Sequence, residues 1–117
     1  MLIIEREVGD VVVVEPRGRL DVTTREEFYG VLSGTLQQGA RRILLDLSGV
    51  SSIDSTAVGV LFGVYTSLRK REGVLRLANV GERVARLLEF LSLEGRIDIS
   101  ESVDEALEKF AQERQER

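Results

Sequence analysis

The sequence predicts one mixed α/β domain over residues 1–117, with a mainly parallel sheet of about five strands and about four helices. Short apolar runs alternate along the chain with segments whose apolar residues recur at helical spacing. Single helices of about 10 to 15 residues separate most of the runs, which favours right-handed crossovers between parallel strands. The first two runs are separated only by a tight turn, and a length of 117 residues suits one hydrophobic core.

An antiparallel hairpin is expected at the start of the chain. Leu2–Ile4 and Val11–Val14 are rich in β-branched and aliphatic residues, and Gly9 and Asp10 between them are turn residues. Pro16 lacks a main-chain N–H and is expected to end the second strand or to confine it to an edge.

A first helix is expected to begin at Thr24, because Thr24–Glu27 has the spacing of a capping box. Four apolar residues follow at helical spacing, namely Phe28, Val31, Leu32 and Leu36. Gly39 is expected to close this helix. The nearly continuous apolar run Ile43–Leu47 is then typical of a central strand that is covered on both faces.

A second helix is expected from Thr56, with cations at 69–71 in its last turn and Gly73 just beyond. Its expected inward residues are Ala57, Val60, Leu61, Val64 and Leu68. Gly59 and Gly63 lie four residues apart in this helix, where each costs about 1 kcal/mol relative to alanine. Close packing of the helix against the sheet is the expected reason, and a closely docking partner is the alternative.

The rest of the chain predicts a strand, a helix, a strand and a final helix. These are expected at 74–80, 82–91, 97–99 and from Ser102 onward, where Ser102–Glu105 has the spacing of a second capping box. The inward residues of the third helix are expected to be Val84, Leu87, Leu88 and Leu91. Those of the fourth helix are Val103, Ala106, Leu107 and Phe110, and the polar tail 112–117 is expected to fray.

Composition argues against several classes of function. With no cysteine and no histidine, the chain lacks disulfides, the usual zinc ligands and the general base of a serine protease triad, so we expect no metal site and no catalytic residues. The phosphate-binding loop of nucleotide-binding proteins is missing, so no cofactor is expected. The net charge of -4 comes from interleaved acids and bases, which argues against nucleic acid as a partner. No apolar run approaches about 20 residues, so no membrane insertion and a cytoplasmic location are expected.

The segment Ser51–Thr56 gathers one acid and several hydroxyls between the strand at 43–47 and the second helix. Loops that lead from strands into helices form the functional edge of α/β sheets. Each of Asp54, Ser55 and Thr56 is able to cap the helix, a role worth about 0.5 to 2 kcal/mol. A hydroxyl there could also receive a phosphate. From the residues alone, capping is the favoured explanation and phosphorylation remains the alternative.

Three stretches of the chain together resemble the STAS domain (sulfate transporter and anti-sigma factor antagonist). They are Ile43–Ser48, Asp54–Gly59 and Leu75–Val80, and the order of elements matches over almost the whole chain. The resemblance places the family's phosphorylated serine at Ser55, with Thr56 as a less likely acceptor. Gly18–Asp21 resembles the Gly-x-Leu-Asp that the family has beside its phosphorylation loop. The residues expected to bind a partner are Asp21, Asp54, Ser55, Thr56, Ala57 and Gly59.

The main departure from the family pattern is Ala57, where glycine is frequent, and its added methyl could alter how closely a kinase approaches. The resemblance implies a non-enzymatic partner switch in transcription. The unphosphorylated domain binds an anti-sigma factor that is also a serine kinase and supplies ATP and magnesium, and phosphorylation ends the binding. The resemblance also implies a serine phosphatase that resets the switch, and the protein is expected to be a monomer or weak dimer. The alternative is a STAS scaffold or accessory subunit of a sensory or lipid-transport assembly, in which Ser55 only caps.

Overall fold

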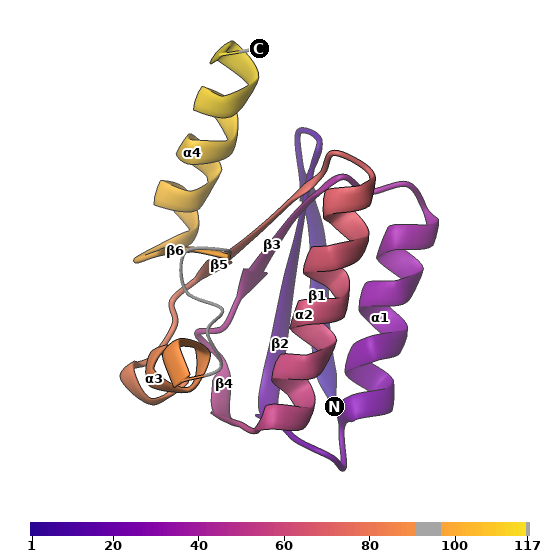
Figure 1. The fold of residues 1–117 in the computed structure, drawn as a ribbon, viewed down its shortest axis with the longest axis vertical. Helices are drawn as coiled ribbons and strands as arrows, with labels where there is room; N and C mark the ends of the chain where they lie inside the picture. The colour runs from indigo at the N-terminus through magenta and orange to yellow at the C-terminus, as the bar shows by residue number, and fades with distance from the viewer. Residues whose placement is uncertain (91–96, 117) are drawn as a thin grey trace.

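The computed structural model describes residues 1–90 and 97–116, and it confirms the mixed α/β class (Figure 1). Within those residues the chain forms six strands and four helices. In chain order they are β1 (Leu2–Val8), β2 (Val11–Leu20), α1 (Arg25–Gln37), β3 (Arg42–Asp46), β4 (Val50–Ile53), α2 (Ser55–Lys70), β5 (Val74–Ala78), α3 (Glu82–Phe90), β6 (Asp98–Ser100) and α4 (Val103–Glu116).

The strands form one sheet in the order β1-β2-β3-β5-β6, with β4 paired to β2 beyond the end of β3. The predicted hairpin is confirmed, because β1 and β2 are antiparallel with Val8 opposite Val11. The pairs β2–β3, β2–β4, β3–β5 and β5–β6 are all parallel. The mainly parallel sheet therefore follows the expected helical crossovers.

The strand β4 was not predicted, since its residues fall within the segment expected to be a loop. Pro16 also does not end β2, which continues to Leu20. Pairing with β3 ends at Val14, and pairing with β4 begins at Gly18. Pro16 therefore falls in the gap between two parallel partners, where its missing N–H interrupts neither ladder.

Helices cover both faces of the sheet (Figure 1). The larger core cluster lies under α1, α2 and α3 and includes Phe28, Leu61 and Leu88. The predicted inward residues Val84 and Leu87 pack against this cluster, whereas Leu91 lies outside the described residues. On the opposite face, Ala106 and Phe110 of α4 form a second cluster with residues of β2, β3 and β5.

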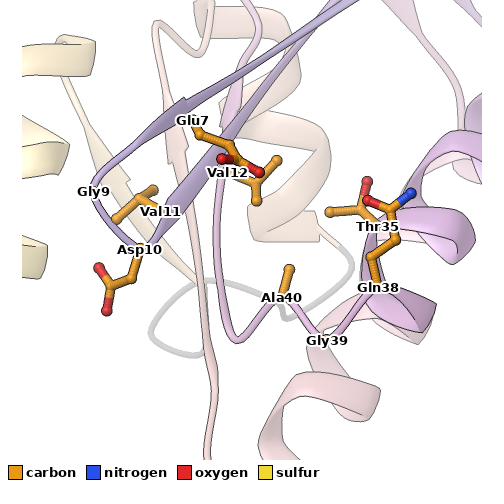
Figure 2. A pocket seen from close by; sticks show the side chains of 9 residues that line it. All are labelled: Glu7, Gly9, Asp10, Val11, Val12, Thr35, Gln38, Gly39 and Ala40. Atoms are coloured by element: carbon orange, nitrogen blue, oxygen red, sulfur yellow. The ribbon is translucent and has the colours of Figure 1, made fainter.

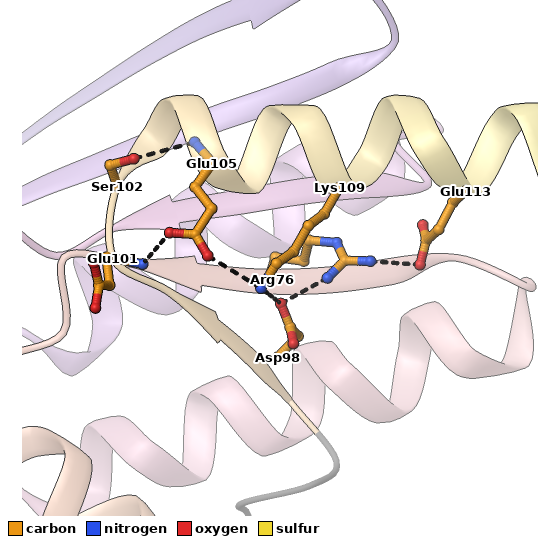
Figure 3. A network of polar contacts seen from close by, with 7 residues as sticks. All are labelled: Arg76, Asp98, Glu101, Ser102, Glu105, Lys109 and Glu113. Atoms are coloured by element: carbon orange, nitrogen blue, oxygen red, sulfur yellow. Dashed lines mark hydrogen bonds and ion pairs between the residues drawn. The ribbon is translucent and has the colours of Figure 1, made fainter.

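A buried arginine reinforces the attachment of α4 to the sheet. Arg76 of β5 is 8% exposed, and it donates to Asp98 of β6 at 2.7 Å and to Glu113 of α4 at 2.6 Å (Figure 3). Its guanidinium carbon lies 5.1 Å from the centroid of the Phe110 ring. The two carboxylates compensate for the desolvation of the guanidinium, so this charge joins three elements. The helix α4 extends to Glu116, into the range expected to fray.

One predicted capping box forms and the other does not. The Ser102 hydroxyl accepts from the Glu105 N–H at 3.1 Å, and the Glu105 carboxylate accepts from the Glu101 N–H at 3.2 Å. Thr24 makes no capping bond to α1, so that part of the prediction is wrong. Its hydroxyl instead donates to the Arg19 carbonyl at 2.7 Å, because its backbone is in the αR region and not in the extended region typical of a cap.

The packing expected for Gly59 and Gly63 is also not found. A methyl group added at either glycine would meet no atom within 4 Å, and both residues are exposed. They therefore do not serve close packing of α2 against the sheet. Gly73 contrasts with them, since a Cβ added there would lie 2.5 Å from the Arg41 carbonyl oxygen.

Candidate functional site

The candidate site lies where β2 and β4 end side by side. Leu20 is paired with Ile53, so the two polar segments that follow these residues leave the sheet at the same edge. The Asp54 N–H donates to the Leu20 carbonyl at 3.0 Å and extends this alignment by one residue. The pairing thus joins the loop that begins at Asp21 to the start of α2.

Asp54 is the N-cap of α2. Its backbone is extended, with φ -116° and ψ 179°, and its side chain accepts from the Ala57 N–H at 3.1 Å. A carboxylate at this position satisfies an N–H that has no partner inside the helix, and its negative charge opposes the positive end of the helix dipole. Capping of α2 is therefore performed by Asp54 and not by either hydroxyl.

Ser55 is the first residue of α2, and its side chain is exposed. Among the described residues, its hydroxyl has no hydrogen-bond partner. Thr56 is half-buried. The Ser55 hydroxyl is accessible, and the local fold does not depend on a hydrogen bond from it.

The two small residues predicted for partner binding lie on different sides of α2. Ala57 is 1% exposed, and its methyl belongs to the larger core cluster. The departure from glycine at this position consequently adds a core contact and not a surface group. Gly59 lies on the exposed side of the helix, one turn beyond Ser55.

The Asp21 loop is held by its own side chains. The Asp21 carboxylate accepts from the Thr23 N–H at 2.9 Å and from the Thr23 hydroxyl. The Arg19 Nε lies 3.8 Å from an oxygen of the same carboxylate. The Thr23 hydroxyl bond holds the pKa of Asp21 below its usual value, and the Arg19 charge acts in the same direction. Val22 is 71% exposed at the centre of this loop.

Sequence reasoning missed the contributions of Arg19, Thr23 and Thr24 to this loop. Asp-x-Thr is a spacing at which a side chain accepts from the backbone two residues on, so this signal was present in the sequence. The Thr24 hydroxyl completes the loop by accepting from the Asp21 N–H at 3.1 Å. The capping-box pattern concealed this other use of the same residue.

In the part of the chain that the structure describes, no group of three or more acids, histidines or cysteines is arranged to hold a metal ion. A cavity of about 200 Å³ is lined by Glu7, Asp10, Thr35, Gln38 and neighbouring residues (Figure 2). It lies beside the turn between β1 and β2, at the opposite end of β2 from Leu20 and the candidate site. No helix among the described residues is long and apolar enough to cross a membrane.

Known proteins share both the sequence pattern and the fold. The family model for the STAS domain matches residues 3–106. The anti-sigma-B factor antagonist of Staphylococcus aureus is 33% identical over 91 residues, which cover 78% of this chain and 84% of that protein. A candidate anti-sigma factor antagonist of Thermotoga maritima, known from its crystal structure, is 30% identical with a TM-score of 0.87, and 92% of each chain is covered.

A more distant structure shares the fold alone. It is the phosphorylated form of the Bacillus cell fate determinant SpoIIAA, which is 23% identical with a TM-score of 0.75 over 93% of this chain and 99% of that one. The α/β fold of this chain is thus shared by other proteins of known structure. The chain belongs to the STAS domain family.

Proposed function

We propose that the protein is an anti-sigma factor antagonist whose binding is switched by phosphorylation of Ser55. The unphosphorylated form binds an anti-sigma factor with serine kinase activity and so releases a sigma factor. Names of relatives in this family support the first part of the proposal. At the start of α2, Asp54 caps the helix and Ser55 is exposed, which supports phosphorylation of Ser55 as the switch.

The observation that carries the proposal is that Asp54, and not Ser55, caps α2. In a serine that capped the helix, phosphorylation would convert the accepting hydroxyl oxygen into a phosphate ester, so the cap would have to rearrange. Ser55 is exposed and lacks a capping hydrogen bond among the described residues, so modification leaves the cap in place. The start of α2 therefore combines a retained cap with an accessible hydroxyl.

A phosphate on Ser55 suits the fold electrostatically. It adds about -1.5 to -2 charges and three acceptor oxygens at the helix end where N–H groups and the dipole favour an anion. The charge of Asp54 opposes it, but Ser55 is exposed and Asp54 is only half-buried, so solvent and salt screen the repulsion. A solved phosphorylated structure with this fold agrees with the expectation that the domain remains folded.

A docked partner responds differently to the same charge. The surface around Ser55 in its unmodified form carries the carboxylates of Asp21 and Asp54, and the pKa of Asp21 is already lowered by its own loop. A partner that fits this surface closely must desolvate any added phosphate. A loss of about 3 to 4 kcal/mol would weaken binding by two to three decades.

Titration of the anti-sigma factor against variants tests the switch. We expect Ser55→Ala to bind as tightly as the unphosphorylated wild type, and Ser55→Asp to bind about tenfold or more weakly. Ser52→Asp is the matched control, because it puts the same charge on an exposed serine of β4. Equal affinities of Ser55→Ala and Ser55→Asp, or an equal loss in Ser52→Asp, would contradict the mechanism.

Incubation with the kinase and ATP, followed by mass spectrometry, tests the acceptor directly. Phosphate is expected on Ser55 in the wild type and is expected to be lost in Ser55→Ala. Thr56→Val, which keeps the shape of the side chain, is expected to be phosphorylated like the wild type. Phosphate that persists in Ser55→Ala and is lost in Thr56→Val would assign the switch to Thr56.

A further inference from the structure

The outer faces of α1 and α2 lack charge over most of their length. Residues 28–40 and 55–68 contain no aspartate, glutamate, lysine or arginine, although 31% of the chain is charged. A helix on a protein surface normally carries charged residues on the side opposite its apolar stripe, as α3 and α4 do here. Depletion of charge is instead a property of the central part of protein interfaces.

Each of these two helices also exposes an aromatic ring. Tyr29 of α1 is 51% exposed and Phe62 of α2 is 41% exposed. Between the helices lies a groove of about 300 Å³, and its lining includes Tyr29, Ser33, Gly63, Ser67 and Arg71. Aromatic side chains are enriched at interface centres, and a groove of this size has room for one such ring.

The surface around the groove is open to close approach. Gly59 and Gly63 have no atom within 4 Å of an added methyl group, and the same holds for Gly30 and Gly34 on α1. The helix penalty of these glycines is thus not offset by packing within the chain. We call the uncharged outer residues of α1 and α2, with Tyr29 and Phe62, the α1–α2 face.

The charges at the two ends of the α1–α2 face have opposite sign. Both helices run in the same direction (Figure 1). At their amino ends lie Glu26 and Glu27 of α1 and the cap Asp54, and they are opposed by Arg25 and by the terminal ammonium of Met1, which pairs with Glu27 at 2.8 Å. At the carboxyl end of α2 lie Arg69, Lys70 and Arg71, with Glu72 opposing them. The face is therefore neutral in its centre, acidic at one end and basic at the other.

This pattern is self-complementary about the middle of α2. The helix spans Ser55–Lys70, so its midpoint falls between Phe62 and Gly63. A two-fold axis there makes the helices of two copies antiparallel and brings the acidic end of each copy to the basic end of the other. The antiparallel arrangement also opposes the helix dipoles favourably. A parallel arrangement would instead bring like charges together.

We propose that the α1–α2 face is a self-association surface, on which a second copy of this chain packs antiparallel around Phe62 and Gly63. In this dimer, Phe62 of each copy enters the groove between α1 and α2 of the other. The proposal rests on the opposite charges at the two ends of the α1–α2 face and on its uncharged centre. It does not depend on phosphorylation of Ser55.

Sedimentation equilibrium of the full chain tests whether the dimer forms. We expect the wild type to dimerise below about 1 mM, and Phe62→Glu to raise the dissociation constant about tenfold or more by placing a charge at the centre. Leu2→Glu is the matched control, because Leu2 is a 57% exposed apolar residue on β1 and lies outside the face. It is expected to dimerise like the wild type. Circular dichroism checks that both variants are folded.

Disulfide trapping tests the antiparallel register, because the chain contains no cysteine of its own. Gly63→Cys lies next to the expected axis and should form a covalent dimer under mild oxidation. Ile99→Cys, at an exposed position of β6, should remain monomeric. A covalent dimer of Ile99→Cys with none of Gly63→Cys would overturn the proposed geometry.

A wild type that stays monomeric up to about 1 mM would overturn the proposal, as would equal loss of dimer in Leu2→Glu. If the wild type is monomeric and Phe62→Glu lowers the affinity for an anti-sigma factor, the face belongs to that partner and not to a second copy. Neither result bears on the Ser55 switch, which is tested by variants at position 55.

Discussion

The main-chain N–H of Asp54 donates to the carbonyl oxygen of Leu20 at 3.0 Å, so the cap of α2 is joined to the end of β2. Asp21 follows Leu20 directly, and Ser55 follows Asp54. One hydrogen bond between residues 34 positions apart in the printed sequence thus places the two segments of the candidate site together. Substitutions at Asp54 and at Asp21 are therefore expected to affect stability in different ways.

Asp54→Ala is expected to lower the free energy of unfolding by about 0.5 to 2 kcal/mol, because the Ala57 N–H loses its acceptor. The Asp54 bond to Leu20 is made by the main chain and persists in the variant. Urea unfolding with Ser55→Ala as control measures the effect. Ser55→Ala is expected to stay within about 0.5 kcal/mol of the wild type. A cost at Ser55 equal to that at Asp54 would show that the serine shares the capping role.

Asp21→Asn is expected to remove a pH-dependent contribution to stability. The pKa of Asp21 is lowered in the folded protein from an ordinary value of 3.8, so the carboxylate stabilises the fold above that pH. The contribution is lost as the pH falls through the lower folded pKa. The stability difference between wild type and variant should therefore shrink between about pH 6 and pH 2.

Urea unfolding across that range gives the stability difference, and carbon NMR titration of the Asp21 carboxyl gives the folded pKa. Asp104→Asn, at an exposed acid in the first turn of α4, is a control for the general effect of removing one negative charge. A folded pKa of Asp21 at or above 3.8 would contradict the role assigned to Thr23.

Gly59→Ala and Gly63→Ala are each expected to raise the free energy of unfolding of dilute protein by up to about 1 kcal/mol. The added methyl meets nothing within 4 Å, and alanine favours the helix over the unfolded chain. Gly73→Ala is the contrasting variant and is expected to destabilise, since its Cβ would lie 2.5 Å from the Arg41 carbonyl oxygen. Thermal unfolding compares the three, and destabilisation by Ala at 59 or 63 would indicate packing within the chain.

Local patterns predicted much of the fold because they act over a few residues. The Gly9–Asp10 turn gave the hairpin, and the apolar run at 43–47 gave the central strand β3. The short strand β4 lacked such a signal, since Val50–Ile53 is polar in its middle and is a strand only through pairing with β2. Thr24 shows a related limit, because a threonine near a helix start serves a cap or a loop according to its backbone conformation.

The sequence by itself determined the fold class and the lack of histidine and cysteine, and its resemblance to the STAS domain indicated Ser55 as the residue to test. These depend on periodicity, on composition and on a local motif. Only the tertiary structure decided that Asp54 is the cap, that Asp21 lies at the same sheet edge, and that Gly59 and Gly63 face open solvent. The physical reason is that capping, strand pairing and burial depend on neighbours that are distant in sequence, and folding selects one of several locally acceptable partners.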